Sequence, residues 1–195
     1  MTELRKLYLT GTEYESGVSG IDRITNVLET IDYSHHEIHA GSNYRVQANA
    51  SATSITIAFK TPSGDKLAHF LFEWNAESTG YIDLLEGTTI TASTGTDRIC
   101  RNSRRDAGDT SMLLGYATGA WVANYVTIDP TITGGTVVSN KQVYTDAKQG
   151  GSSGERRAEI ILAADTEYAL KWTSTDGAKG IQLRCEWYEH TDKNI

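Results

Sequence analysis

The segment IQLRCEW at residues 181–187 alternates apolar with polar side chains, so that Ile181, Leu183, Cys185 and Trp187 share one side of an extended chain. This two-residue period is typical of a β-strand that buries one face and exposes the other. The same alternation recurs at residues 44–48, 55–59, 70–74 and 168–172. The pattern therefore predicts a chain built from short, half-buried strands.

These segments favour an all-β fold, and within that class an antiparallel, jelly-roll-like β-sandwich. Short strands separated by turns with Gly and Asp, without a long amphipathic helix, argue against an α/β fold. Residues 112–116 and 121–128 are further strand candidates. The turn at residues 62–65 predicts a hairpin, and the segments from residue 160 to residue 187 predict a short antiparallel meander.

The chain divides into a predicted N-terminal arm, residues 1–30, and a sandwich domain, residues 31–195. Residues 1–20 have no hydrophobic period and are expected to be ordered only by docking to something else. Ile21–Thr30 could form one helical turn or part of an extended arm. Thr88–Asp109 and Thr131–Gly154, rich in small and polar residues, are predicted to be long loops that could contact a partner.

The charge of the chain limits its partners. Of its 195 residues, 25 are acidic and 18 are basic, which gives a net charge of −7. Phosphate recognition usually requires a basic surface, so this charge argues against non-specific nucleic-acid binding. Residues 1–20 lack the apolar region of a signal peptide, and no stretch approaches the length of a membrane span. We expect neither nucleic acid nor membrane as a partner.

The two cysteines, Cys100 and Cys185, lie far apart in the sequence. Two cysteines in a chain of this length do not form a disulfide scaffold. Unpaired cysteines are often buried, and Cys185 belongs to the alternating run quoted above. We therefore expect free, partly buried thiols.

A metal site must be considered at residues 33–39, which hold three of the five histidines. In a strand, His35, Glu37 and His39 would share one face, where they could bind a divalent ion. The spacing does not match a zincin motif, because no Glu follows His35 directly. Histidines in strands more often pack or bond to the backbone, so we expect no metal here and keep these three residues as the alternative.

Signatures of catalysis are missing from the sequence. No serine lies in a Gly-x-Ser-x-Gly elbow, and no phosphate-binding loop is present. Glu186 and Glu189 flank Trp187 and Tyr188, which could hold a sugar as in a glycosidase cleft, although a solvated strand face with a buried Trp187 fits the alternation better. We expect no enzymatic activity and no cofactor.

Four arginines, Arg98, Arg101, Arg104 and Arg105, lie within eight residues, close to Asp97, Asp106 and Asp109. They could contact nucleic acid, form local ion pairs, or bind carboxylates of a neighbouring subunit, for which the bidentate geometry of Arg is well suited. Because the chain is acidic, we favour the last two interpretations equally. The four arginines are therefore the candidate partner contacts.

Two segments carry a resemblance to a known family: IDYSHHEIHAGSNY at residues 31–44, and CEWYEHTDK at residues 185–193. We name them the first block and the second block. They resemble blocks of a group of tailed-phage virion proteins, the head decoration or cement proteins. The blocks could be adjacent strands, with Tyr44, Trp187 and Tyr188 supplying buried aromatic area.

The resemblance implies a function on the virion. It implies a non-enzymatic structural protein that binds the outside of a phage capsid and stabilises it, with the major capsid protein as partner. It also implies a homo-oligomer, which we expect to be a trimer. The expected location is the capsid surface of the virion, after assembly in the host cytoplasm.

Two other functions stay open at this point. One is a phage adhesion or receptor-binding module that binds glycans with Trp121, Tyr125 and the Gly-rich loop. The other is a metal-dependent enzyme that uses His35, Glu37 and His39.

Overall fold

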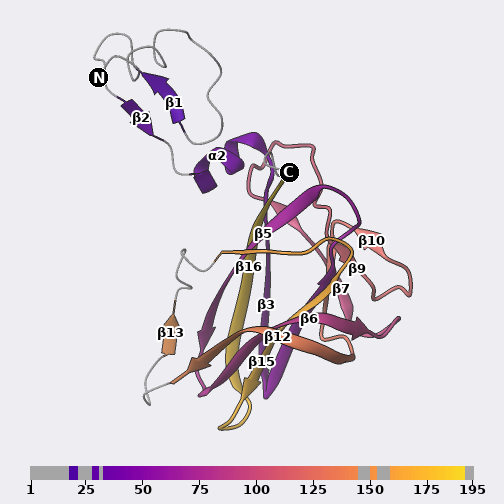
Figure 1. Ribbon diagram of the computed structural model, residues 1–195. Coiled ribbons are helices and arrows are strands. Elements are labelled where there is room, and N and C mark those ends of the chain that lie inside the picture. Colours follow the sequence, from indigo (N-terminus) through magenta and orange to yellow (C-terminus); the bar gives the residue numbers. More distant parts are fainter. Residues whose placement is uncertain (1–17, 22–27, 31–32, 145–149, 153–158, 192–195) are drawn as a thin grey trace.

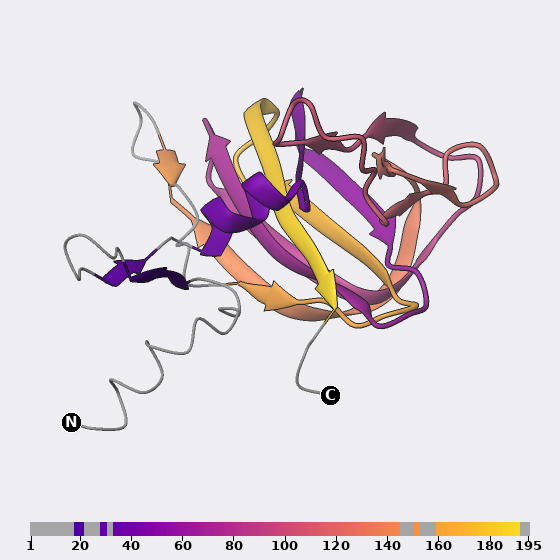
Figure 2. The same ribbon diagram turned by 90° about the horizontal axis from the view of Figure 1, so that it is seen from above.

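The computed structural model describes residues 18–21, 28–30, 33–144, 150–152 and 159–191, and strands dominate them (Figure 1). Two antiparallel sheets, each named after a central strand, pack against each other as a sandwich (Figure 1 and Figure 2). The predicted all-β sandwich is confirmed.

The β16 sheet has the strand order β13-β5-β16-β3-β8, and β14 also pairs with β5. Its longest strand, β16 (Lys179–Thr191), lies between β5 (Lys66–Ala76) and β3 (Asn43–Ala52). The remaining strands are short: β8 (Arg101–Asn102), β13 (Gly150–Ser152) and β14 (Ile160–Ile161).

The β15 sheet has the strand order β10-β9-β4-β15-β6-β12, and β11 pairs with both β4 and β7. Its long strands are β4 (Ser54–Lys60), β15 (Glu167–Ser174), β6 (Gly80–Ile90) and β12 (Ile132–Val143). The short ones are β7 (Thr96–Ile99), β9 (Leu114–Gly115), β10 (Val122–Ala123) and β11 (Tyr125–Ile128).

The core lies between the sheets and has the composition that the alternation predicts. Along β16, Ile181, Leu183, Cys185 and Trp187 are buried, while the residues between them face outward. Aromatic rings join the two layers: Phe59 of β4 and Phe70 of β5 have ring centroids 5.4 Å apart. Burial of such rings is the main source of stability in a fold of this kind.

The predicted hairpin and the predicted meander are wrong. β4 and β5, which flank the turn at residues 62–65, lie in different sheets and do not form a hairpin. The predicted meander fails in the same way, because β14 and β16 belong to one sheet and β15 to the other. Alternation identifies which face of a strand is buried. It does not identify the sheet to which the strand belongs, because both sheets of a sandwich bury one face in the same core.

The two predicted loops also contain strands. β12 extends over twelve residues inside Thr131–Gly154 and pairs with β6 along its length. The sequence does not predict this strand, because it is an edge strand whose residues are mostly exposed. Neither of its faces is buried, so its sequence shows no alternation of apolar and polar residues. Thr88–Asp109 likewise holds the end of β6, β7 and β8, while β9, β10 and β11 lie within the two further strand candidates.

The N-terminal part differs from a simple arm where it is described. β1 (Val18–Ile21) and β2 (Leu28–Thr30) pair with each other and with neither large sheet (Figure 1). Residues 1–17, most of the predicted arm, lie outside the described residues.

Residues 33–40 form a helix, α2 (Tyr33–Ala40), where a strand was the assumption behind the metal interpretation. Gly41 ends it with φ of +80°, and the amides of Gly41 and Ser42 donate to the carbonyls of Ile38 and Glu37 at 3.1 Å each. This pair of bonds is the Schellman arrangement, which favours Gly because of the left-handed backbone. The chain then turns directly into β3.

Candidate functional site: an arginine groove

A hollow of about 610 Å³ lies on the outer side of the β16 sheet, where β7 and β8 cross from one sheet to the other. We name it the arginine groove. Its lining is dominated by guanidinium groups from four strands and consists of Arg45, Val46, Gln47, Arg98, Ile99, Arg101 and Arg184.

Strand register brings these arginines together. Arg45 of β3 faces Arg101 of β8 directly, and on its other side β3 places Gln47 opposite Arg184 of β16. The buried positions on either side of Arg45 are Tyr44 and Val46, so the strand period turns its guanidinium outward. The sheet itself therefore assembles the positive charge.

Carboxylates neutralise only part of this charge. Arg184 pairs with Glu186 at 2.9 Å and with Glu73 at 3.5 Å. Arg98 donates to the backbone oxygen of Gln47 at 2.5 Å, which satisfies a hydrogen bond but leaves the charge unpaired. Arg45, Arg98 and Arg101 form no ion pair with any carboxylate of the residues that the structure describes.

Asp97, the acid next to Arg98 in the sequence, points away from the groove. Asp97 precedes Arg98 on β7, and its carboxylate accepts hydrogen bonds from the Thr127 hydroxyl at 2.8 Å and from the Ala117 amide at 3.0 Å. Adjacent residues of a strand point to opposite sides, so Asp97 and Arg98 are separated by the backbone. The local ion pairing that the sequence allowed is therefore not formed between them.

The four arginines singled out in the sequence separate into two groups. Arg98 and Arg101 line the groove. Arg104 lies outside it, where it pairs with Asp106 at 2.8 Å and donates to the His39 carbonyl at 2.8 Å, and Arg105 is exposed. Arg45 and Arg184 were missed. Both occupy polar positions of alternating runs, so the sequence indicates that their side chains face outward. It does not indicate the strand pairing that brings them to one groove.

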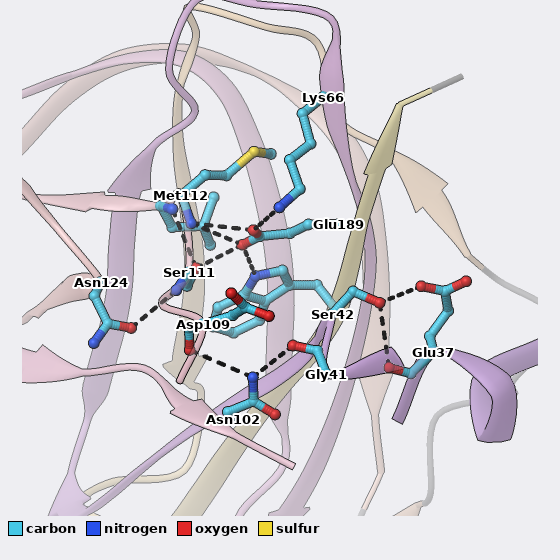
Figure 3. A network of polar contacts seen from close by, with 12 residues as sticks. Glu37, Gly41, Ser42, Lys66, Asn102, Asp109, Ser111, Met112, Asn124 and Glu189 are labelled. Carbon is cyan, nitrogen blue, oxygen red and sulfur yellow. Dashed lines mark hydrogen bonds and ion pairs between the residues drawn. The ribbon is translucent and has the colours of Figure 1, made fainter. Parts of the chain in front are cut away.

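A buried carboxylate fixes the chain segment that follows β8 (Figure 3). Glu189 of β16 is fully buried and accepts hydrogen bonds from the Ser111 hydroxyl at 2.6 Å, the Trp187 indole at 2.9 Å and the Met112 amide at 3.0 Å. The Lys66 ammonium lies 3.4 Å from its second oxygen. Four partners compensate for taking this charge out of water.

Further contacts hold β8 at its place beside β3. The Asn102 amide donates to the Gly41 carbonyl at 2.6 Å (Figure 3). The Ser103 backbone amide donates to the Asn43 carbonyl at 2.9 Å. On the other side of Arg101, Cys100 is buried, and its amide donates to the Asn124 carbonyl at 2.9 Å. The Arg101 backbone is therefore anchored on both sides.

Both thiols are free and buried, as expected. Burial, with a smaller contribution from the Glu189 charge, raises the pKa of the Cys100 thiol to about 12, and burial also raises the pKa of Cys185. The thiol groups are therefore protonated at neutral pH and act as apolar core side chains.

The histidine segment has a different geometry from the one assumed. On α2, position 37 lies about half a turn from positions 35 and 39, so Glu37 does not share their face. The buried Glu37 instead accepts a short hydrogen bond from the Ser42 hydroxyl, and the His36 ring lies 3.3 Å from it (Figure 3). Among the described residues, no group of three or more His, Cys, Asp or Glu could hold a metal ion.

Two histidines that are isolated in the sequence meet on the outer face of the β16 sheet. The rings of His69 and His190 stack at 4.3 Å, and His69 also stacks on Tyr188. Glu159 lies 2.5 Å from the His69 ring nitrogen and accepts the Tyr188 hydroxyl at 2.6 Å. This cluster joins β5 and β16 to the residue before β14.

Trp121 and Tyr125, the residues proposed to bind glycans, already contact other residues of the chain. Trp121 stacks on Tyr116 at 4.0 Å with an angle of 6° between the rings, and the Lys60 ammonium lies 5.7 Å from the Trp121 ring. A sugar would compete with these neighbours for the aromatic face. Tyr125 lies in β11, opposite Ile99 of β7.

Comparison with protein-family models, curated proteins and solved structures finds no match to this chain. No helix among the described residues is long and apolar enough to cross a membrane.

Proposed function

We propose that the chain is a non-enzymatic virion structural protein that binds the outside of a phage capsid, with the major capsid protein as its partner, and stabilises the shell as a decoration protein. The observation that carries the binding part of this proposal is the arginine groove, in which Arg45, Arg98 and Arg101 form no ion pair with a described carboxylate.

The chemistry of the groove supports binding over catalysis. A guanidinium group keeps its proton at all physiological pH values, so it cannot act as a general base. It can only attract, orient and hydrogen-bond an anionic group. Among the described residues that line the groove, none is a nucleophile or a carboxylic acid.

The virion part of the proposal comes from the two blocks, which meet at the groove. The first block ends at Tyr44, directly before Arg45, and the second begins at Cys185, directly after Arg184. β3 and β16 pair Tyr44 with Trp187, and the two rings stack at 6.1 Å. The segments that resemble decoration proteins therefore border the surface that we propose for contact.

The proposed binding unit is a homotrimer on the capsid surface. Symmetric oligomers match the symmetric junctions of a shell, and a rigid sandwich can present the same groove in every copy.

Mass spectrometry of purified virions from the phage that encodes the chain tests the proposal. We expect the protein on the particle at a copy number comparable with that of the capsid protein. Adding the full chain to heads that lack it should restore bound protein in sedimentation and raise the temperature at which the heads open. A copy number far below that of the capsid protein, or heads that do not bind the chain, would contradict the proposal.

A further inference from the structure

We infer that the arginine groove is a receptor for carboxylate side chains of an acidic protein segment, held by Arg45, Arg98 and Arg101. This inference names the ligand class of the proposed contact surface, and it rests on the proposed function for the identity of the partner.

The first argument is electrostatic. Arg45 and Arg101 are direct cross-strand partners, and like charges in such a pair destabilise a sheet. The other cross-strand partner of Arg45 is Glu186, which forms its ion pair with Arg184 instead. Arg98, which lines the same hollow, adds a third positive charge. An anion bound among the three would remove this repulsion, and carboxylates match the planar, two-pronged geometry of guanidinium groups.

The second argument is that the acids bordering the groove are already engaged. Glu73 and Glu186 pair with Arg184, and Asp97 is bonded to Thr127 and Ala117. A conformational change of one side chain would therefore not neutralise the three arginines without breaking an existing contact. None of these described acids is therefore free to supply the missing charge, and we assign it to a carboxylate of another molecule.

The third argument concerns the class of ligand. The hollow of about 610 Å³ exceeds what a small inorganic anion needs, and Ile99, which is 40% exposed, adds apolar lining. Such a lining suits the aliphatic stems of acidic side chains and their neighbours. A nucleic-acid strand would carry its continuous row of phosphates past Glu73 and Glu186 on a chain of net charge −7. Separate carboxylates avoid that repulsion.

The test uses the full chain and a fluorescein-labelled hexaglutamate peptide, followed by fluorescence anisotropy at low ionic strength. We expect hexaglutamate to bind and a hexaglutamine peptide not to bind. The double variant Arg98→Gln/Arg101→Gln should weaken binding about tenfold or more, because both lose charge-assisted hydrogen bonds. Arg105→Gln is the matched control, since it removes one exposed arginine of the same segment outside the groove, and it should bind like the original chain.

Several outcomes would overturn the inference. The first is that hexaglutamate does not bind. The second is that the double variant and Arg105→Gln lose the same affinity for hexaglutamate. The third is that a single-stranded oligonucleotide binds through the same arginines more tightly than hexaglutamate does. If the double variant unfolds at a lower temperature than the original chain, the single variant Arg45→Gln provides the same comparison.

The same variants separate this inference from the proposed function. Heads that bind the chain and the double variant equally would support decoration and refute the groove as its contact. Hexaglutamate binding that depends on Arg98 and Arg101, with no binding to heads, would support the groove chemistry and refute the capsid partner.

Discussion

At the scale of single residues, the side chains that distinguish this sandwich are charged groups in two environments. Glu189 lies inside the core and is saturated with donors, whereas Arg45 and Arg101 lie outside and form no ion pair with a described carboxylate. A buried charge with four partners stabilises a structure only while all of them remain. An exposed cluster of like charges instead favours association.

Replacing Glu189 by Gln tests the buried network. The amide keeps the shape but loses the charge. With its oxygen in place of Oε1, which accepts from Ser111 and Trp187, its NH₂ group would face two donors, the Lys66 ammonium and the Met112 amide. We expect the free energy of unfolding to fall by about 1–3 kcal/mol in urea titrations. Glu186→Gln, on the outward side of the same strand, is the control and should cost less than about 1 kcal/mol. Equal effects of the two changes would contradict the role given to Glu189.

The buried thiols predict a dependence on alkaline pH. The pKa of Cys100 is about 12 in the folded chain against an ordinary value of 9.0, so the folded state keeps its proton where the unfolded state loses it. The free energy of unfolding contributed by this group is complete below pH 9.0 and falls as the pH rises toward 12. Chemical denaturation across this pH range should show that decline.

Alkylation gives an independent measurement of the same property. At pH 8 we expect iodoacetamide to modify Cys100 and Cys185 slowly in the native chain and rapidly in urea, because only an accessible thiolate can attack the reagent and displace its iodide. Modification of the native chain at the rate of a free thiol would show that these groups are neither buried nor protonated.

At the scale of elements, close contact between strands limits which side chains fit. Gly80 begins β6, where a Cβ atom would lie 2.2 Å from the Thr173 carbonyl oxygen and 2.7 Å from the Trp172 ring. Backbone cannot yield as a long side chain can, so the pairing of β6 with β15 depends on glycine here.

The change Gly80→Ala should therefore destabilise the fold by about 3 kcal/mol, seen as a lower midpoint of thermal or urea unfolding. Gly108→Ala is the matched control, because nothing lies within 4 Å of its Cβ position and its φ is not in the left-handed region. The prediction fails if both variants unfold at the midpoint of the original chain.

At the scale of the whole molecule, the body of the sandwich is complete without the N-terminal residues. Every buried hydrophobic residue of the described chain lies between Tyr44 and Tyr188. β1 and β2 pair only with each other. Removing the first strand therefore breaks no strand pairing of the two large sheets.

Deletion of residues 1–20 should leave the unfolding midpoint of the body nearly unchanged while abolishing binding to capsids, if the N-terminal part acts as a clamp on the shell. Circular dichroism and sedimentation with heads measure the two effects separately. Unchanged capsid binding would refute the clamp, and loss of the β-sheet signal would refute the independence of the body.

The sequence alone determined the strands that bury one face, the composition of the core, the acidic charge and the free thiols. The buried faces and the core follow from a local two-residue period, as in residues 181–187, whereas the charge and the free thiols follow from residue counts. The same period, continued past Trp187, places Glu189 on the inner side, so its burial could have been predicted as well.

The tertiary structure decided everything that depends on which strands are neighbours. The chain alternates between two sheets, so β4 pairs with β15 and β3 with β16, although each is far from its partner in sequence. The edge strand β12 has no period to reveal it. The arginine groove draws on four strands, and its like-charged pair, Arg45 and Arg101, exists only through their register. Side-chain periodicity is local, whereas register is set by the packing of distant segments around a shared core.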